Sequence, residues 1–258
     1  MAIFLAIVIV VIAIPYVVGP VMLWLNGSRM YPTRLEAADP SRPLPTKAAA
    51  HFWKTTHYFS SNGFEAFGVR LQESAPNGLA FHKQLWRHAR TGETALVGAL
   101  LKQSDPEFCN AFVAFLHERE HGALLSTSNF NGGARAFLDP PGTSKLVADY
   151  QDPADLRALH QGHVAVYAGE KVQPLRVRDE YEFSKRLDSI TRQLALSTKR
   201  FRPDGDGLRI TAWGALFGIW SNLPPFKGKY DKAERRLLDD ALQAGTAAGL
   251  TMPRLKAA

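Results

Sequence analysis

The longest uncharged, largely apolar segment lies at the start of the chain, where residues 1–26 carry no charged side chain. About 20 apolar residues are needed to cross the ~30 Å hydrocarbon core of a bilayer, and membrane helices tolerate prolines such as Pro15 and Pro20. Trp24 lies near the end of the segment, where membrane helices often place aromatic anchors. The pattern predicts a transmembrane anchor over residues 1–26, with a cleaved signal peptide and a buried helix as alternatives.

The basic residues of the chain all follow this apolar segment, beginning at Arg29. Because lysine and arginine favour the cytoplasmic side of a membrane, we expect a single-pass protein with its N-terminus outside and its soluble domain in the cytoplasm. Proline recurs in residues 27–46, which predicts an extended linker. The soluble domain is then expected to fill residues 47–258.

Helical and alternating patterns both occur after the linker, and together they predict an α+β fold for the soluble domain. Alternating segments bounded by turn residues predict an antiparallel β-meander over residues 64–130. Asp152 followed by Pro153 is a typical helix start, and later segments carry apolar residues at helical spacing. One helix is predicted before the sheet, at residues 46–61, and later helices at residues 152–169, 178–199 and 231–248 are predicted to cover the sheet.

The candidate chemistry centres on the string His117-Glu118-Arg119-Glu120-His121. On a helix, His117 and His121 could share one Zn²⁺ while Glu118 activates a bound water molecule, as in zinc hydrolases. The rival interpretation places residues 111–116 in a buried strand and residues 117–122 in a hairpin loop, which needs no cofactor. A third interpretation is the ordinary end of a helix that binds no metal. The backbone conformation of residues 106–122 separates the hairpin from the two helical interpretations.

Two further histidines, His160 and His163, are three residues apart in a predicted helix and therefore share one face of it. They could supply ligands to one ion, but no carboxylate or cysteine partner is evident in the sequence. The simpler expectation is that they are core or capped histidines. No phosphate-binding loop and no nucleophile elbow occurs in the sequence.

The formal net charge of +7 arises after residue 170, where lysine and arginine outnumber the acidic residues. Within this part, residues 210–226 carry no charge and contain several aromatic side chains, which allows a core element, an interfacial segment or a short second span. Basic and aromatic residues around this segment are predicted to contact an anionic lipid surface. They are Arg200, Arg202, Arg209, Trp213, Trp220, Lys227 and Lys229.

These patterns predict a membrane-anchored cytoplasmic domain that acts as a binding or structural module beside the inner leaflet. The lipid bilayer is the expected partner, a second protein is the alternative partner, and nucleic acid is not expected because no known module occurs. The alternative function is a membrane-bound, peptidase-like zinc hydrolase that uses His117, His121 and Glu118. The leading interpretation requires no cofactor.

Overall fold

A computed structural model describes residues 14–27, 29–30, 34–38, 43–75, 78–102, 104–120, 123–130 and 144–254. Its contacts divide the chain into two compact units, which we call the hairpin unit and the sheet unit. The hairpin unit comprises Met1–Pro32, Gly132–Pro140 and Asp188–Ala233. The sheet unit comprises Thr33–Asn131, Pro141–Leu187 and Glu234–Ala258.

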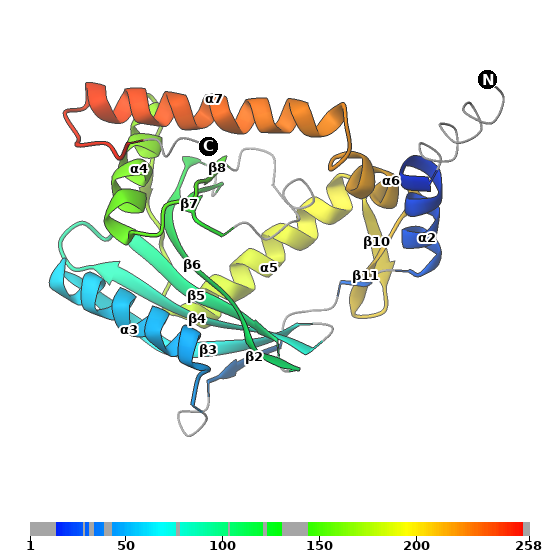
Figure 1. Cartoon of the computed structure of the whole chain (residues 1–258), viewed down its shortest axis with the longest axis horizontal. Coiled ribbons are helices and arrows are strands. Elements are labelled where there is room, and N and C mark those ends of the chain that lie inside the picture. Colours follow the sequence, from blue (N-terminus) through cyan, green and yellow to red (C-terminus); the bar gives the residue numbers. More distant parts are fainter. Residues whose placement is uncertain are drawn as a thin grey trace. The chain divides into compact units, whose positions relative to one another are not determined.

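The sheet unit is built on an eight-stranded sheet in which β2 to β8 follow one another in chain order (Figure 1). Neighbouring strands are antiparallel, except that β7 and β8 are parallel. The short strand β9 pairs beside the end of β6. The strands are β2 (Arg34–Ala37), β3 (Phe64–Ala75), β4 (Leu79–His88), β5 (Thr94–Lys102), β6 (Asp105–Glu118), β7 (Leu124–Ser128), β8 (Ser144–Val147) and β9 (Gln173–Pro174). This arrangement confirms the α+β class and the predicted meander.

Helix α3 (Thr46–Ser61) lies along one face of this sheet (Figure 1). It forms because buried residues recur at helical spacing, and it ends where Gly63 adopts a φ of 77°. Its Phe59 is fully buried and stacks on Trp86 of β4, with 5.5 Å between ring centroids. Burying one such aromatic side chain contributes about 1.5–3 kcal/mol, so this contact fixes α3 on the sheet.

Helix α4 (Pro153–Val166) covers the same core beside α3, with Leu156 and Leu159 fully buried. As the sequence predicts, it begins after Asp152, whose side chain accepts a hydrogen bond from the backbone N–H of Ala154. The C-terminal half of α7 (Phe226–Ala247) packs closely on α4 at Gly162. A Cβ atom at residue 162 would lie 2.3 Å from a main-chain oxygen of α7, which only glycine allows.

The opposite side of the sheet unit receives the first turns of α5 (Glu180–Ser197). Strand β3 has a register shift between Phe67 and Leu71, and Gly68 there adopts a φ of 86°. The carboxylate of Glu180 occupies the space that a side chain at residue 68 would take, and it accepts a hydrogen bond from the backbone N–H of Leu85 at 3.4 Å. The bulge therefore leaves room for the side chain of Glu180, which holds the start of α5 against the sheet.

The hairpin unit contains a small antiparallel sheet in the order β1, β11, β10, together with short helices. Its apolar core gathers Phe201, Leu208, Ile210 and Ala215, with Leu23 packed against it. Its elements are η1 (Ile14–Val18, a π-helical turn), α2 (Gly19–Leu25), β1 (Arg29–Met30), β10 (Phe201–Asp204), β11 (Gly207–Ile210) and α6 (Ala212–Trp220).

The predicted transmembrane helix over residues 1–26 is contradicted by this structure. Residues 1–13 lie outside the described residues, and the helix that is described, α2, has seven residues and a length of about 10 Å. Leu23 of α2 packs on the core of the hairpin unit, which gives part of the apolar segment a protein environment. Over the described ranges, every helix is too short or too polar to cross a bilayer. The predicted single-pass membrane localisation, which depended on that anchor, is wrong with it.

Two strands fall inside residues 27–46, the segment expected to be a linker. Strand β1 pairs with β11 in the hairpin unit, and β2 pairs with β3 in the sheet unit. Backbone hydrogen bonding, which the proline content did not indicate, therefore holds two parts of this segment, residues 29–30 and 34–37.

Candidate functional site

The string His117–His121 begins at the end of a strand rather than on a helix. Strand β6 runs to Glu118 and β7 returns from Leu124, which confirms the hairpin interpretation. Successive strand residues point to opposite faces, so His117 and Glu118 cannot converge on one metal ion as they would on a helix. His121 lies outside the described residues. The described side chains include no group of three His, Cys, Asp or Glu that could hold a metal ion.

Glu118, the general base of the zinc alternative, is engaged in an ion pair with α5. Its carboxylate oxygens accept hydrogen bonds from the two terminal nitrogens of Arg186 at 2.6 and 3.2 Å. This hydrogen bond, opposed by burial, lowers the pKa of Glu118, and the backbone N–H of Arg176 adds to the effect. A carboxylate paired in this way is a poor proton acceptor, so we interpret Glu118 as a structural residue that seats α5.

His117 points instead to the face of the sheet that α4 covers. Its Nδ1 lies 2.8 Å from Nε2 of His160, and the Nδ1 of His160 lies 3.0 Å from the hydroxyl of Thr127 on β7. The structure therefore joins the two histidine groups that the sequence presents separately. As predicted, His160 and His163 share one face of the helix, which is the face turned toward the sheet.

The hydrogen bonds continue from Thr127 to the end of α4. The Thr127 hydroxyl lies 2.9 Å from Nδ1 of His163, and Nε2 of His163 lies 2.8 Å from the hydroxyl of Ser144 on β8. Tyr167 donates its hydroxyl hydrogen to Ser144 at 2.9 Å. We call this continuous set the histidine chain; its members are His117, His160, Thr127, His163, Ser144 and Tyr167.

Burial keeps the histidines of this chain uncharged at neutral pH. His160 and His163 are both fully buried. Burial is the main cause that lowers the pKa of His163 to about 4, with a smaller contribution from the charge of Arg119. Burial likewise holds the pKa of His160 well below its usual 6.5, helped by His117, His163 and the charge of Arg157. The pKa of His117 is also lowered by burial, against the attraction of Glu93.

When all six groups are neutral, each of these contacts can hold one hydrogen atom between a donor and an acceptor. A neutral imidazole donates through one nitrogen and accepts through the other, and a hydroxyl can do both. If Tyr167 donates to Ser144, then Ser144 donates to His163, His163 to Thr127, and so on to His117. Reversing every donor gives an equally complete chain, so the contacts fit a network that holds no net charge.

The contact between Ser144 and His163 resembles the pairing of a nucleophile with a base, yet its surroundings do not support hydrolysis. The Nδ1 of His163 faces the Thr127 hydroxyl, whereas a catalytic triad places a carboxylate there. A histidine with a pKa of about 4 is a weak base at neutral pH. Ser144 is also buried, with 6% of its surface exposed, so substrate has no direct access to it.

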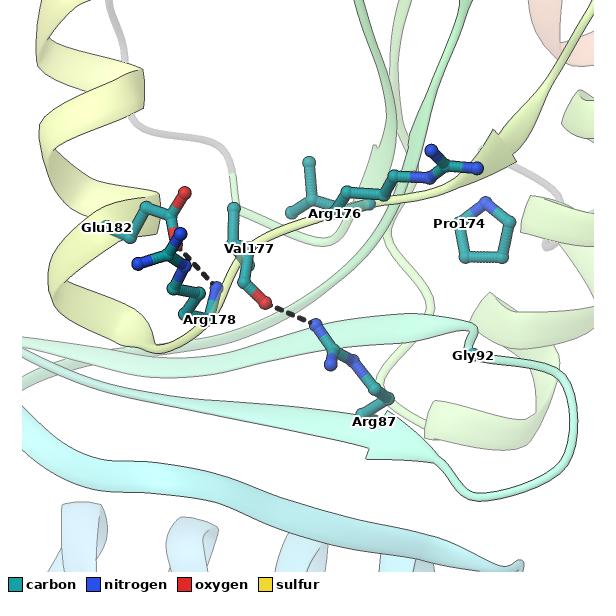
Figure 2. A pocket seen from close by; sticks show the side chains of 8 residues that line it. Arg87, Gly92, Pro174, Arg176, Val177, Arg178 and Glu182 are labelled. Atoms are coloured by element: carbon teal, nitrogen blue, oxygen red, sulfur yellow. Dashed lines mark hydrogen bonds between the residues drawn. The ribbon is translucent and has the colours of Figure 1, made fainter.

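A second feature of the sheet unit is an open pocket of about 570 Å³ beside the start of α5 (Figure 2). Three arginines, Arg87, Arg176 and Arg178, contribute to its lining, and Glu182 lies at one side. The backbone of residues 174–178 forms one wall, and the turn between β4 and β5 contributes Gly92. The remaining lining residues are Pro174, Leu175 and Val177.

The three arginines of this pocket differ in how they are held. Arg87 donates a hydrogen bond to the carbonyl oxygen of Val177 at 2.7 Å and lies 3.9 Å from the ring centroid of Phe67. Arg176 and Arg178 are exposed, and across the described ranges neither guanidinium forms a hydrogen bond or an ion pair. The carboxylate in the lining belongs to Glu182, and it accepts a hydrogen bond from the backbone N–H of Arg178 at 2.7 Å.

The seven residues predicted to contact lipid all belong to the hairpin unit. Arg202 and Arg209 face each other across β10 and β11, and the guanidinium of Arg200 lies 3.6 Å from the ring centroid of Phe217. Lys227 and Lys229 are exposed in the first turns of α7. Their contact with a lipid surface stays a prediction that the structure does not test.

Of the two predicted tryptophans, Trp213 is 55% exposed on α6. Trp220 instead donates its indole N–H to the carbonyl oxygen of Tyr16 at 2.8 Å. Helix α6 also buries Gly214 and Ala215. Residues 210–226 therefore combine core and surface positions, and the second-span alternative is wrong because no described helix could cross a bilayer.

Several residues of the site had no functional interpretation in the sequence. Thr127 and Ser144 are hydroxyl residues in strands, a common placement that does not distinguish them from other serines and threonines. The pocket had a usable signal, because Leu175-Arg176-Val177-Arg178 alternates buried and exposed residues as an extended segment does. That alternation places both arginines on one side of the segment. The charge of the two residues alone does not predict this placement.

No protein-family model, no curated protein and no solved structure matches this chain. The candidate sites therefore rest on the geometry of the chain's own residues.

Proposed function

We propose that the sheet unit is a binding domain for a small anionic ligand, such as a carboxylate or a phosphate, which it takes up in the arginine pocket. The observation that carries the proposal is the set of three guanidinium groups around one open pocket. The pocket volume of about 570 Å³ lies within the range of small-molecule sites, roughly 300–1,000 Å³. The binding role expected from the sequence is kept, but it moves from a lipid surface to this pocket.

The charge of the pocket supports an anion rather than a neutral ligand. The lining contains three arginines and one carboxylate, and that carboxylate already accepts a backbone hydrogen bond, while the charge of Arg176 also acts on Glu118 outside the lining. Guanidinium groups form paired hydrogen bonds to carboxylate and phosphate oxygens, and each bond to a charged group contributes about 1.5–3 kcal/mol. Arg87 is held in place by Val177 and Phe67, so it loses little side-chain freedom when a ligand binds.

The test is calorimetric titration of the full chain with inorganic pyrophosphate and, separately, with citrate. Because one charged hydrogen bond is worth a factor of roughly ten or more in affinity, Arg176→Gln and Arg178→Gln should each raise the Kd about tenfold. Arg235→Gln makes the same charge change at an exposed position of α7 away from the pocket, and it should leave the Kd unchanged. Binding should also weaken as ionic strength rises.

Two results would overturn the proposal. One is the absence of saturable binding by either probe at 10 mM, roughly the weakest affinity that two charged hydrogen bonds would leave. The other is an equal loss of affinity in Arg235→Gln and in the pocket variants, because that would show a general response to net charge.

A further inference from the structure

The histidine chain is the main polar contact between α4 and the sheet. Two histidines of α4 meet groups from three strands, namely His117 on β6, Thr127 on β7 and Ser144 on β8. Apolar packing surrounds this contact, because Phe115 stacks on His160 with 5.8 Å between ring centroids. The binding energy between α4 and the sheet is therefore sensitive to the charge state of the two helix histidines.

Few charged groups face the histidine chain, and most of them are already paired. Glu93 of β5 lies near His117 but forms an ion pair with Arg157 of α4 at 2.7 Å. Arg119, after β6, forms an ion pair with Glu170 at 2.7 Å and lies over the ring of Tyr167. From α7, the residue packed on α4 at Gly162 is the uncharged Ala241. From α3, Tyr58 faces Arg157, and β9 brings Pro174 beside His117.

The chain of hydrogen bonds can absorb one added proton but not two. If His163 is protonated, both of its nitrogens donate, and rotation of the Ser144 and Tyr167 hydroxyls keeps the neighbouring contacts complete. If His160 is protonated as well, both Nδ1 atoms direct hydrogens at the Thr127 oxygen, and the hydroxyl hydrogen loses its acceptor. The two positive rings would then lie 6.5 Å apart in a buried site.

We propose that the histidine chain is an acid-sensitive latch, which holds α4 on strands β6 to β8 at neutral pH and releases the helix when it takes up protons. The released helix exposes its imidazoles to water, where they hold the added protons without a desolvation penalty. Release is local to α4, because α3 is fixed on the sheet by its own aromatic packing through Phe59 and Trp86.

The expected size of the effect follows from His163 alone. Its pKa of about 4 in the closed state rises to the ordinary value of about 6.5 once the ring is in water. Proton linkage then makes the opening equilibrium roughly 60-fold more favourable at pH 4.5 than at pH 7. Protonation of His160 in the opened state adds to this factor in the same direction.

Hydrogen exchange of the full chain tests the latch, with peptides from α4 compared with peptides from α3 at pH 7 and pH 4.5. After correction for intrinsic exchange rates, protection in α4 should fall about 60-fold and should lie at least tenfold below that in α3 at pH 4.5, because α4 opens without unfolding of the sheet unit. The double variant His160→Gln/His163→Asn cannot take up these protons and should lose this pH response. His57→Gln, at an exposed histidine of α3, should keep the full response.

If the double variant fails to fold, nuclear magnetic resonance can instead follow the protonation of the imidazoles in the wild-type protein as the pH is lowered. Protonation of His163 that coincides with loss of protection in α4 supports the latch. The proposal is overturned if both His160 and His163 become protonated while α4 stays protected, because the closed chain can hold only one added proton. It is equally overturned if α3 and α4 have the same protection at pH 4.5, because α4 would then open only when the whole sheet unit unfolds.

Discussion

The variant Thr127→Val probes the centre of the histidine chain. Thr127 is fully buried, and its hydroxyl lies 2.9 Å from Nδ1 of His163 and 3.0 Å from Nδ1 of His160. Valine keeps nearly the same volume, so no cavity forms, but both ring nitrogens lose their partner inside the core. Each buried polar group left unsatisfied costs about 1–3 kcal/mol, so the variant should lower the free energy of unfolding by about 2–5 kcal/mol.

Urea denaturation at pH 7, followed by circular dichroism, measures this loss as a shift in the transition midpoint at constant slope. Thr55→Val is the matched control because Thr55 is equally buried, but its hydroxyl bonds only to carbonyl oxygens of its own helix at 2.8 and 3.1 Å. The control should cost less than about 1 kcal/mol. An equal or smaller loss in Thr127→Val than in Thr55→Val would refute the view that the histidine chain stabilises the packing of α4.

Three further predictions concern the packing and charge of the sheet unit. Gly162→Ala should lower the free energy of unfolding by about 1–3 kcal/mol, because the added methyl group meets the backbone of α7, whereas Gly169→Ala has open space and should be neutral in the same denaturation assay. Glu118→Gln should cost about 1–2 kcal/mol by weakening the pair with Arg186, without changing the metal content measured by mass spectrometry. Because the pKa of His163 is about 4 in the folded state and about 6.5 unfolded, stability should be complete above pH 6.5 and fall by up to about 3 kcal/mol toward pH 4, which urea midpoints at several pH values will show.

Local patterns predicted much of the sheet unit, because they reflect forces that act over a few residues. The helix at Thr46–Ser61 and the strands that flank residues 91–93 follow from periodicity and turn residues. The start of α4 follows from the cap at Asp152. These elements needed no knowledge of distant contacts.

The candidate sites were less predictable because they depend on contacts between residues far apart in the chain. His117 and His160 are 43 residues apart, and only the register of β6 beside α4 brings their rings together. The five-residue zinc pattern failed because the Phe- and Val-rich segment before it pairs as a strand, which separates His117 from Glu118. Tertiary pairing here outweighs a local helical interpretation.

The transmembrane prediction for the apolar N-terminal segment was wrong for a similar reason, because it too was made without knowledge of distant contacts. Hydropathy predicts that residues 14–25 avoid water, but it does not say which surface they contact. In the described part of that segment, Leu23 packs on a protein core, whereas several other large apolar side chains remain exposed, and no described helix has both the length and the apolar character needed to cross a bilayer. Whether an apolar segment crosses a membrane or packs on protein depends on partners that hydropathy alone does not reveal.

The tautomers of His160 and His163 test the central claim most directly. Both rings approach Thr127 through Nδ1, and the Thr127 hydroxyl has one hydrogen to donate. One ring must therefore carry its proton on Nδ1 and the other on Nε2, and long-range ¹H–¹⁵N correlation at pH 7 should show two neutral imidazoles of opposite tautomer. Two rings of the same tautomer, or a ring that is protonated at pH 7, would contradict the continuous neutral chain.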